Sequence, residues 1–212
     1  MKPTVFGAAY SVYARIARLA LEEKAVDYAL EEVDIFAPGG PPASYLERQP
    51  FGRIPSFEHE GFRLYETAAI TRYVDRAFPG TPLQPASPRD LARMDQVIAI
   101  LDSYAYRTLV WDIFVERVRA PTRGRAPDEA RIADALAKAR TVLGELNRLR
   151  AERPYLAGET LTLADIHAAP MFVYFAMAPE GAELLKAIPG LSSWCSRIAA
   201  RPSLARTRSP FE

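Results

Sequence analysis

The sequence predicts two domains of different class, a small mixed α/β domain followed by an all-helical domain. Three observations support this prediction. Strand-like and helix-like segments alternate over the first ~80 residues, a proline-rich segment without periodicity follows, and the later periodic segments repeat their apolar residues at helical spacing. We expect the α/β domain over residues 1–79, a linker over 80–88 and the helical domain over 89–212.

The first domain is expected to follow the order β-α-β-α-β-β-α, which describes a small mixed sheet flanked by helices. Its strands show short apolar or alternating runs, and its helices repeat apolar residues with the helical period. The expected segments are a strand in 3–9, a helix in 13–24, a strand in 27–36, a loop in 37–44, a hairpin in 54–66 and a helix in 67–78. The hairpin is expected to turn near Glu60 and Gly61.

The linker and the helical domain differ in composition. The segment PGTPLQPASP, residues 79–88, holds four prolines and shows no periodicity. The expected helices lie in 89–118, as one long helix or two in tandem, in 128–151, in 162–177 and in 191–203. The third of these segments begins with Thr162 and Asp165, whose spacing resembles a capping box. We therefore interpret this pair as structural.

The overall composition excludes several classes of function. The 212 residues carry a formal charge of +1, which gives no electrostatic case for binding nucleic acid or an anionic membrane. No run of about 20 apolar residues is present, and polar residues interrupt the N-terminal segment, so we expect neither a membrane span nor a secretory signal. The single cysteine, Cys195, fits a reducing compartment, and we predict a cytoplasmic protein. His59 and His167 have no metal-ligand partner at useful spacing, so we predict no metal site.

Pro55 stands at the start of the first hairpin strand, in the segment GRIPSFEHEG. A proline there fits an ordinary edge strand, and an X–Pro bond also permits a cis peptide. A proline that turns the chain can instead leave the backbone of Ile54 facing outward, free to pair with an extended peptide. The residues alone leave both interpretations open.

Glu66 and Thr67 open the helix that follows the hairpin. The unsatisfied N–H groups and partial positive charge of a helix N-terminus hold a carboxylate well, and Glu66 beside it can accept from an ammonium group. The pair would therefore suit the amino-acid end of a peptide. Simple capping by Thr67 explains the same residues without any ligand.

Ser11 lies between the first strand and the first helix, in the segment YSVYAR. A hydroxyl at this point can donate a hydrogen bond to a thiolate and so lower the pKa of that thiol. The competing interpretation is an N-cap serine with no ligand. Tyr10 and Tyr13 are alternative hydroxyl donors on the same turn. The predicted first domain contains no cysteine, so it has no thiol of its own for disulfide exchange.

Together these segments resemble the soluble glutathione S-transferases over nearly the whole chain. The segment FGAAYSVYARIARLALEEKAVDYALEEVD is similar to the family's first strand, active-site helix and second strand. The segment QPFGRIPSFEHEGFRLYETAAITRYV is similar to its cis-proline segment and its glutamate–serine/threonine segment. LTLADI and ARPSLART resemble its capping box and its usual ending. The chain looks most like serine-type bacterial members, which are phi-, tau- or theta-like.

The resemblance implies a thioredoxin-like α/β domain that binds glutathione as co-substrate. Ser11 would support the glutathione thiolate, and Ile54, before a cis Pro55, would pair with the cysteinyl residue of glutathione. Glu66 and Thr67 would hold the γ-glutamyl carboxylate and amine.

One departure from the family concerns the glycyl end of glutathione. The loop APGGPPAS lacks the lysine or histidine that often contacts the glycyl carboxylate in the family. Glutathione affinity would therefore be modest, or Arg53 would compensate, because it occupies a position where related sequences place a glutamine or lysine near that end.

The implied activity is conjugation of the glutathione thiolate to a small hydrophobic electrophile, a detoxification reaction, by a homodimer. The electrophile pocket between the domains would be lined by Tyr13, Phe36, Tyr104, Tyr106, Trp111 and Phe114. An aromatic stripe at helical spacing also fits core packing. Two other functions stay open: a glutathione-dependent reductase or peroxidase, and a non-catalytic glutathione-binding scaffold.

Overall fold

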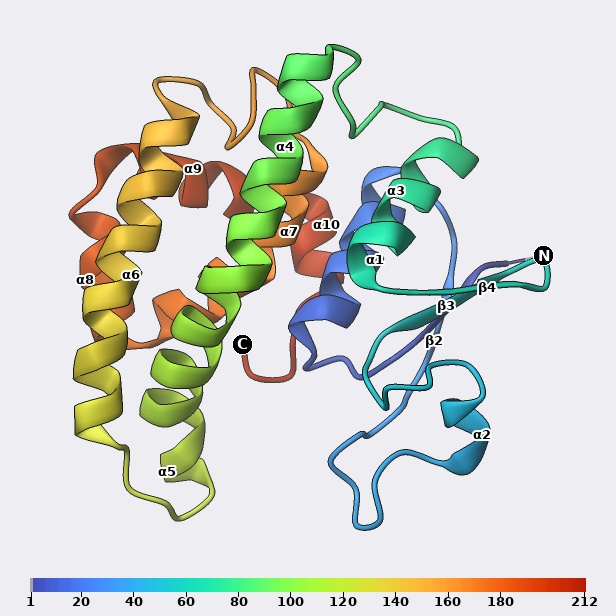
Figure 1. Cartoon of the computed structure of the whole chain (residues 1–212), viewed down its shortest axis with the longest axis horizontal. Coiled ribbons are helices and arrows are strands. Elements are labelled where there is room, and N and C mark those ends of the chain that lie inside the picture. The colour runs from blue at the N-terminus through green and yellow to red at the C-terminus, as the bar shows by residue number, and fades with distance from the viewer. Residues whose placement is uncertain (1) are drawn as a thin grey trace. The chain divides into compact units, whose positions relative to one another are not determined.

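The computed structural model describes residues 2–212, which form two compact units (Figure 1). The first unit comprises the chain up to Leu83 together with Arg201–Glu212, and the second comprises Gln84–Ala200. Within the described residues, no helix combines the length and the apolar character needed to cross a bilayer.

The first unit is the predicted thioredoxin-like α/β fold, built on one mixed sheet with the strand order β2-β1-β3-β4. Strand β1 runs parallel to β2 and antiparallel to β3, and β3 and β4 form an antiparallel hairpin. The elements of this unit are β1 (Thr4–Phe6), α1 (Val12–Glu23), β2 (Ala29–Glu31), α2 (Ala43–Leu46), β3 (Ser56–His59), β4 (Phe62–Tyr65), α3 (Thr67–Ala77) and α10 (Pro202–Arg206).

The sheet register explains which strand residues reach the core. Val5 lies opposite Leu30 on one side and Phe57 on the other, and Val5 and Phe57 are both buried. The predicted hairpin turn is confirmed: Glu60 and Gly61 both have positive φ between β3 and β4. The strand predicted over 27–36 is shorter in the structure, because β2 pairs with β1 over three residues only.

The segment after Ala200 packs against α1 through buried charged groups. Arg15, on α1, is 1% exposed, and its guanidinium donates to the carboxylate of Glu212 and to the Leu204 carbonyl. Arg201 forms a second ion pair with Glu23 at the end of α1. These pairs attach residues 201–212 to the α/β unit although they lie at the far end of the sequence.

The second unit is entirely helical, as predicted. Its elements are α4 (Pro88–Ile100), η1 (Leu101–Arg119), α5 (Ala120–Thr122), α6 (Glu129–Arg150), α7 (Leu163–Met177), α8 (Pro179–Lys186) and α9 (Pro189–Ala199). The helix α4 continues into η1 through Leu101, whose backbone is helical. The hydrogen bonds of η1 have π-helical spacing, and at its end the Ala120 N–H donates to the Val115 carbonyl. The segment 89–118 therefore forms one continuous helical rod.

The helical elements near the end of the chain were only partly predicted. The helix α8 was not expected, because it follows α7 after a single residue, Ala178, with Pro179 at its first position. The single helix predicted over 191–203 is wrong in its extent. The helix α9 ends at Ala199, and Pro202 begins the separate helix α10.

The predicted capping box at the start of α7 is confirmed and is extended by further contacts. Asp165 is fully buried and accepts hydrogen bonds from the N–H and hydroxyl of Thr162, both at 2.9 Å. It also accepts from the Leu156 N–H and from the indole N–H of Trp194, each at 2.8 Å. One carboxylate thus fixes α7, the loop before it and α9 together.

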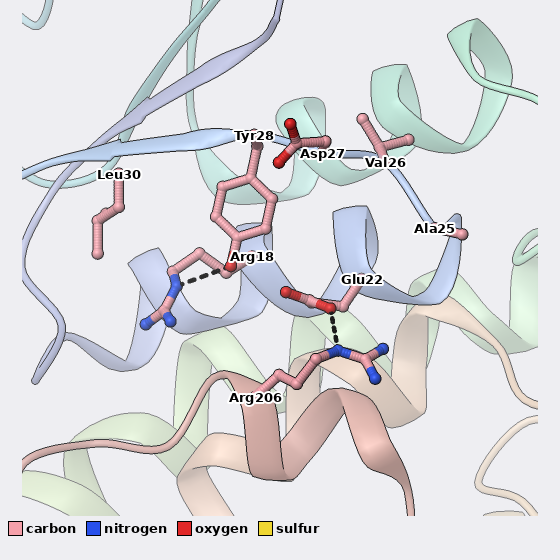
Figure 2. A pocket seen from close by; sticks show the side chains of 8 residues that line it. All are labelled: Arg18, Glu22, Ala25, Val26, Asp27, Tyr28, Leu30 and Arg206. Carbon is pink, nitrogen blue, oxygen red and sulfur yellow. Dashed lines mark hydrogen bonds and ion pairs between the residues drawn. The ribbon is translucent and has the colours of Figure 1, made fainter.

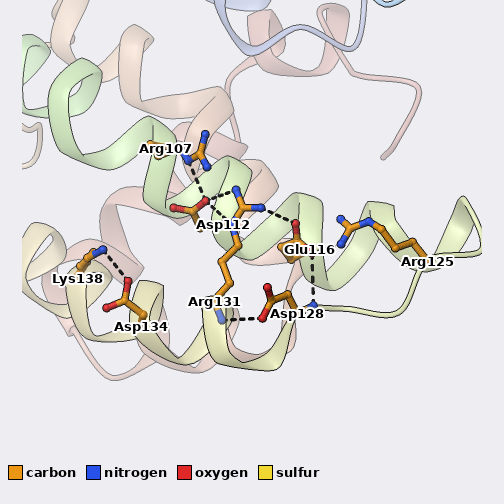
Figure 3. Close-up of polar contacts among 8 residues, drawn as sticks. All are labelled: Arg107, Asp112, Glu116, Arg125, Asp128, Arg131, Asp134 and Lys138. Atoms are coloured by element: carbon orange, nitrogen blue, oxygen red, sulfur yellow. Dashed lines mark hydrogen bonds and ion pairs between the residues drawn. The ribbon is translucent and has the colours of Figure 1, made fainter.

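A network of charged side chains connects η1 to α6 (Figure 3). Arg131 on α6 donates to Asp112 and to Glu116, which both lie on η1. Arg125 also donates to Glu116, whose side chain is 2% exposed, and Arg107 donates to Asp112. The hydrogen bond from Arg125 lowers the pKa of Glu116, against the opposing effect of burial. This network therefore keeps a buried carboxylate ionised.

Candidate functional site

The start of α1 and the Ile54–Pro55 segment meet at Gly7, directly after β1. A Cβ built on Gly7 would lie 2.9 Å from the Ala14 Cβ on α1. The same atom would lie 3.6 Å from the Ile54 Cβ and 3.7 Å from the Pro55 Cα. The absence of a side chain at Gly7 therefore lets two predicted parts of the site approach each other closely.

Ser11 is the N-cap of α1, as the capping interpretation predicted. Its Oγ accepts a hydrogen bond from the Ala14 N–H at 3.2 Å, and its carbonyl accepts one from the backbone N–H of Arg15. A hydroxyl has one hydrogen to donate besides its acceptor lone pairs. Among the described residues the Ser11 hydroxyl donates to no acceptor. Capping therefore fixes the oxygen and leaves its hydrogen available to a ligand.

Tyr10, an alternative hydroxyl donor, is already engaged. Its hydroxyl donates to Asp34 at 3.1 Å, and its ring stacks on Phe36 and Phe211 with centroid distances of 6.2 and 6.1 Å. The ring stack and the Asp34 bond fix the Tyr10 side chain. Ser11 is therefore the better placed donor of the two.

The Ile54–Pro55 peptide is cis, as the resemblance implied. The backbone N–H of Ile54 has no hydrogen-bond partner within the described residues. The loop before it is fixed by Gln49, whose amide oxygen accepts from the N–H groups of Phe51 and Arg53 at 2.8 and 3.1 Å. Gln49 is 1% exposed.

Tyr45 gives the same loop a second attachment, since its hydroxyl donates to the Arg53 carbonyl at 2.6 Å. Sequence reasoning missed both Gln49 and Tyr45 as residues that shape the site. A Pro-Phe-Gly sequence follows Gln49, but it does not reveal that the Gln49 amide is buried. The Arg53 side chain is exposed.

Glu66 occupies a backbone conformation that is costly for a non-glycine residue. Its φ is 68° and its ψ is 110°, and such a conformation costs on the order of 1–3 kcal/mol. It is the N-cap of α3, and no side chain caps this helix. The N–H groups of Ala69 and Ile70 bond to the Glu66 carbonyl, whereas those of Thr67 and Ala68 have no partner among the described residues. The helix start therefore offers free donors beside an exposed carboxylate.

The remaining predicted residues are aromatic and are distributed over both units. In the first unit, Tyr13 lies on α1 and Phe36 is 59% exposed. The other four lie on η1: Tyr104, Tyr106, Trp111 and Phe114. Tyr104 is 63% exposed, whereas Phe114 is 1% exposed and stacks on Tyr174 with ring centroids 4.3 Å apart.

The single cysteine takes no part in this arrangement. Cys195 lies on α9 in the helical unit, and burial raises its pKa to about 12. A thiol with this pKa stays protonated at neutral pH and is a poor nucleophile. Within the described residues, no group of three or more His, Cys, Asp or Glu side chains is arranged to hold a metal ion.

Comparison with known proteins identifies the family of both units. Residues 5–82 match the model of the glutathione S-transferase N-terminal domain, and residues 98–202 match that of the C-terminal domain. The chain belongs to the glutathione S-transferase family.

Individual relatives support the assignment over nearly the full chain. Glutathione S-transferase 4 of Zea mays is 33% identical over 199 residues, which cover 94% of this chain and 88% of that protein. Glutathione S-transferase F7 of Arabidopsis thaliana is 29% identical over 201 residues, which cover 94% and 95%.

Solved structures show the same fold. Glutathione S-transferase I from maize, in complex with an atrazine–glutathione conjugate, has a TM-score of 0.87 at 26% identity, with 98% of this chain and 96% of that chain covered. Glutathione transferase F7 from Populus trichocarpa has a TM-score of 0.84 at 28% identity, with 97% of both chains covered. The thioredoxin-like and helical units are therefore those of a glutathione transferase.

Proposed function

We propose that this chain binds glutathione on its α/β unit and transfers the thiolate to a hydrophobic electrophile. The observation that carries the proposal is the close approach at Gly7, where the first turn of α1, the helix that Ser11 caps, comes near the Ile54–Pro55 segment. The glutathione conjugate bound by the maize relative supports the choice of ligand. The reaction needs no metal, since glutathione itself supplies the nucleophile.

Ser11 is proposed to donate its hydroxyl hydrogen to the glutathione sulfur. A free thiol with a pKa near ~8.5 is only a few per cent ionised at neutral pH. Lowering that pKa by ~2 units requires about 2.7 kcal/mol of preferential stabilisation of the thiolate. A charge-assisted hydrogen bond from Ser11, together with the positive end of α1, is of this magnitude.

The backbone of Ile54 is proposed to hold the middle of the tripeptide. A cysteinyl residue in extended conformation can pair with a free backbone N–H as an added strand does. Gln49 and Tyr45 fix the loop before Ile54, so little conformational entropy is lost when the ligand pairs with it.

The two ends of glutathione are proposed to bind at α3 and at Arg53. The free N–H groups of Thr67 and Ala68 suit the γ-glutamyl carboxylate, and the exposed carboxylate of Glu66 suits its ammonium group. The strained backbone of Glu66 supports a functional role, because such conformations concentrate at ligand sites. Arg53, exposed beside Ile54, is proposed to approach the glycyl carboxylate.

The electrophile is proposed to bind against exposed aromatic side chains. Exposed rings with apolar faces, such as Phe36 and Tyr104, suit small hydrophobic molecules. The proposed lining also includes Tyr13, Tyr106, Trp111 and Phe114. Trp111 and Tyr106 are partly exposed, whereas Phe114 is 1% exposed, so its ring offers little surface to a ligand.

We also propose that the active form is a homodimer in the cytoplasm. The α/β unit exposes Phe51 by 69% and Phe62 by 50%, and Phe51 contacts Tyr65 edge to face. Exposed aromatic side chains of this kind are typical of protein–protein contacts. Light scattering should give a mass of about twice 23.6 kDa, and Phe51→Ser should shift the mass toward the monomer.

The proposal is tested by steady-state conjugation of an aromatic chloride, with Ser11→Ala compared to Tyr10→Phe. Loss of the Ser11 hydroxyl should lower kcat/KM by roughly 10- to 25-fold at neutral pH, because the thiol pKa rises toward ~8.5 and only a few per cent of the bound thiol stays ionised. Tyr10→Phe should change kcat/KM by less than about threefold, because the Tyr10 hydroxyl donates to Asp34. Equal losses in both variants would contradict the assignment of Ser11. Glutathione binding without turnover in the unmodified chain would favour a binding scaffold.

A further inference from the structure

A polar cavity lies on the α/β unit between α1, the start of β2 and α10 (Figure 2). Its volume is about 490 Å³, a size that admits a small organic molecule. The lining residues are Arg18, Glu22, Ala25, Val26, Asp27, Tyr28, Leu30 and Arg206. None of them belongs to the proposed glutathione site.

Arg18 is the unusual residue of this cavity, because it is a buried cation without an acidic partner among residues 2–212. Its side chain lines the cavity, yet the residue is only 8% exposed. Its Nε donates to the Tyr28 hydroxyl at 3.1 Å, and its Nη1 is buried with no hydrogen-bond partner among the described residues. Arginine is rarely buried without a partner, since removing its charge from water is costly.

The neighbouring groups do not supply the missing negative charge. Burial raises the pKa of Tyr28, against the opposing effect of Arg18, so the phenol stays neutral at physiological pH. Glu22 is four residues from Arg18 on α1, the spacing of a helical ion pair, but its carboxylate accepts from Arg206 at 2.5 Å. Asp27 pairs with Lys2 at 2.9 Å. The structure thus assigns both carboxylates of the cavity to other cations.

We propose that this cavity binds the carboxylate of a small organic acid, with Arg18 as the main anion contact. The free side of the guanidinium matches the two oxygens of a carboxylate. Ala25, Val26 and Leu30 give the cavity aliphatic surface for the carbon skeleton of such a ligand. Arg206 contributes indirectly, because it holds Glu22 away from Arg18.

The proposal is tested by titrating the full chain, saturated with glutathione, with benzoate and with the neutral molecule benzyl alcohol. Backbone amide shifts of Val26 and Leu30 report binding at the cavity. Benzoate should shift both amides saturably, and benzyl alcohol should bind at least about tenfold more weakly because it lacks the charge. Inorganic phosphate should also bind more weakly than benzoate, since it cannot use the aliphatic surface. Repeating the titration in Ser11→Ala separates this site from the proposed enzyme function, because binding should be unchanged.

Two sets of variants connect the binding to Arg18. Arg18→Met should weaken benzoate binding at least about tenfold, whereas Arg208→Met, at an exposed arginine outside the cavity, should leave it unchanged. Arg206→Gln keeps Arg18 in place but frees Glu22 to pair with it, so it should also weaken binding. Adding Glu22→Gln to Arg206→Gln should restore much of the lost affinity.

Four results would overturn the proposal. The first is equal binding of benzoate and benzyl alcohol, and the second is benzoate affinity that survives Arg18→Met. The third is a double variant, Arg206→Gln with Glu22→Gln, that binds benzoate no more tightly than Arg206→Gln alone. This result would show that Glu22 does not compete for Arg18. Phosphate binding as tight as benzoate binding would overturn the organic character of the ligand.

Discussion

Gly7 and Ala14 approach so closely that a Cβ on Gly7 would lie 2.9 Å from the Ala14 Cβ. This distance is shorter than two carbon atoms normally tolerate. The contact sets how near the start of α1 comes to Ile54 and Pro55, and so determines the geometry of the proposed glutathione site.

Gly7→Ala should therefore damage both stability and binding. The added methyl group overpacks the contact, and we expect a loss of about 1–3 kcal/mol in the free energy of unfolding. Glutathione affinity should fall as well, because the two parts of the site move apart. Denaturant unfolding and calorimetry measure the two effects. Ala14→Gly added to Gly7→Ala should recover the glutathione affinity, and a double variant as weak as Gly7→Ala would contradict this explanation.

Two substitutions at Glu66 separate the effect of its charge from the effect of its strained backbone. Glu66→Gln should weaken glutathione binding by about tenfold and leave stability nearly unchanged, because only the charge is lost. Glu66→Gly should weaken binding similarly but raise the free energy of unfolding by up to about 1 kcal/mol, since glycine adopts positive φ without strain. Calorimetry and thermal unfolding distinguish the two variants. Unchanged binding in both would exclude Glu66 from the glutathione site.

Much of the fold was predictable because it rests on local patterns. The turn at Glu60 and Gly61 follows from a glycine between two alternating runs, and the Thr162–Asp165 box follows from spacing alone. The resemblance to a known family supplied the cis peptide at Pro55, which the residues themselves left open.

The features that were missed depend on contacts distant in the sequence or on backbone geometry. In the sequence, Arg15 is a charged residue that interrupts an apolar helix. Only the folded chain brings it close to Glu212. The positive φ of Glu66 has no local signal, because the residue is not a glycine. Gln49 shapes the loop before Ile54 through its buried side-chain amide. The polar residues around it in the sequence give no indication of this burial.

Asp165 should be essential to the stability of the helical unit. Asp165→Asn replaces an acceptor oxygen with an NH₂ group among four donors, so at least one buried donor loses its partner. We expect a loss of about 2–4 kcal/mol in the free energy of unfolding. Asp134→Asn, at an exposed residue of α6, is the matched control and should have little effect. A loss as small as that of the control would show that the four contacts are not formed in solution.

The charge network around Glu116 should make the chain sensitive to acid. The pKa of Glu116 is lowered in the folded state, chiefly by the hydrogen bond from Arg125, so its contribution is complete above the ordinary carboxyl pKa. That contribution is lost as pH falls through the lowered value. Glu116→Gln should therefore reduce stability at neutral pH by about 2–4 kcal/mol and flatten the acid limb of the stability curve.

A matched variant distinguishes this buried carboxylate from an exposed one. Glu129 also pairs with an arginine and also has a lowered pKa, but its side chain is 68% exposed. Glu129→Gln should leave the pH dependence of unfolding nearly as it is in the unmodified chain. Similar acid profiles for the two variants would mean that burial of Glu116 has no energetic consequence.

The central claim, that Ser11 ionises bound glutathione, is tested most directly by titrating the ultraviolet thiolate absorbance of the complex. We expect a thiol pKa about 2 units below that of free glutathione in the unmodified chain, and a return toward the free value in Ser11→Ala. A bound thiol that titrates like free glutathione, or the same lowered pKa in both proteins, would contradict it.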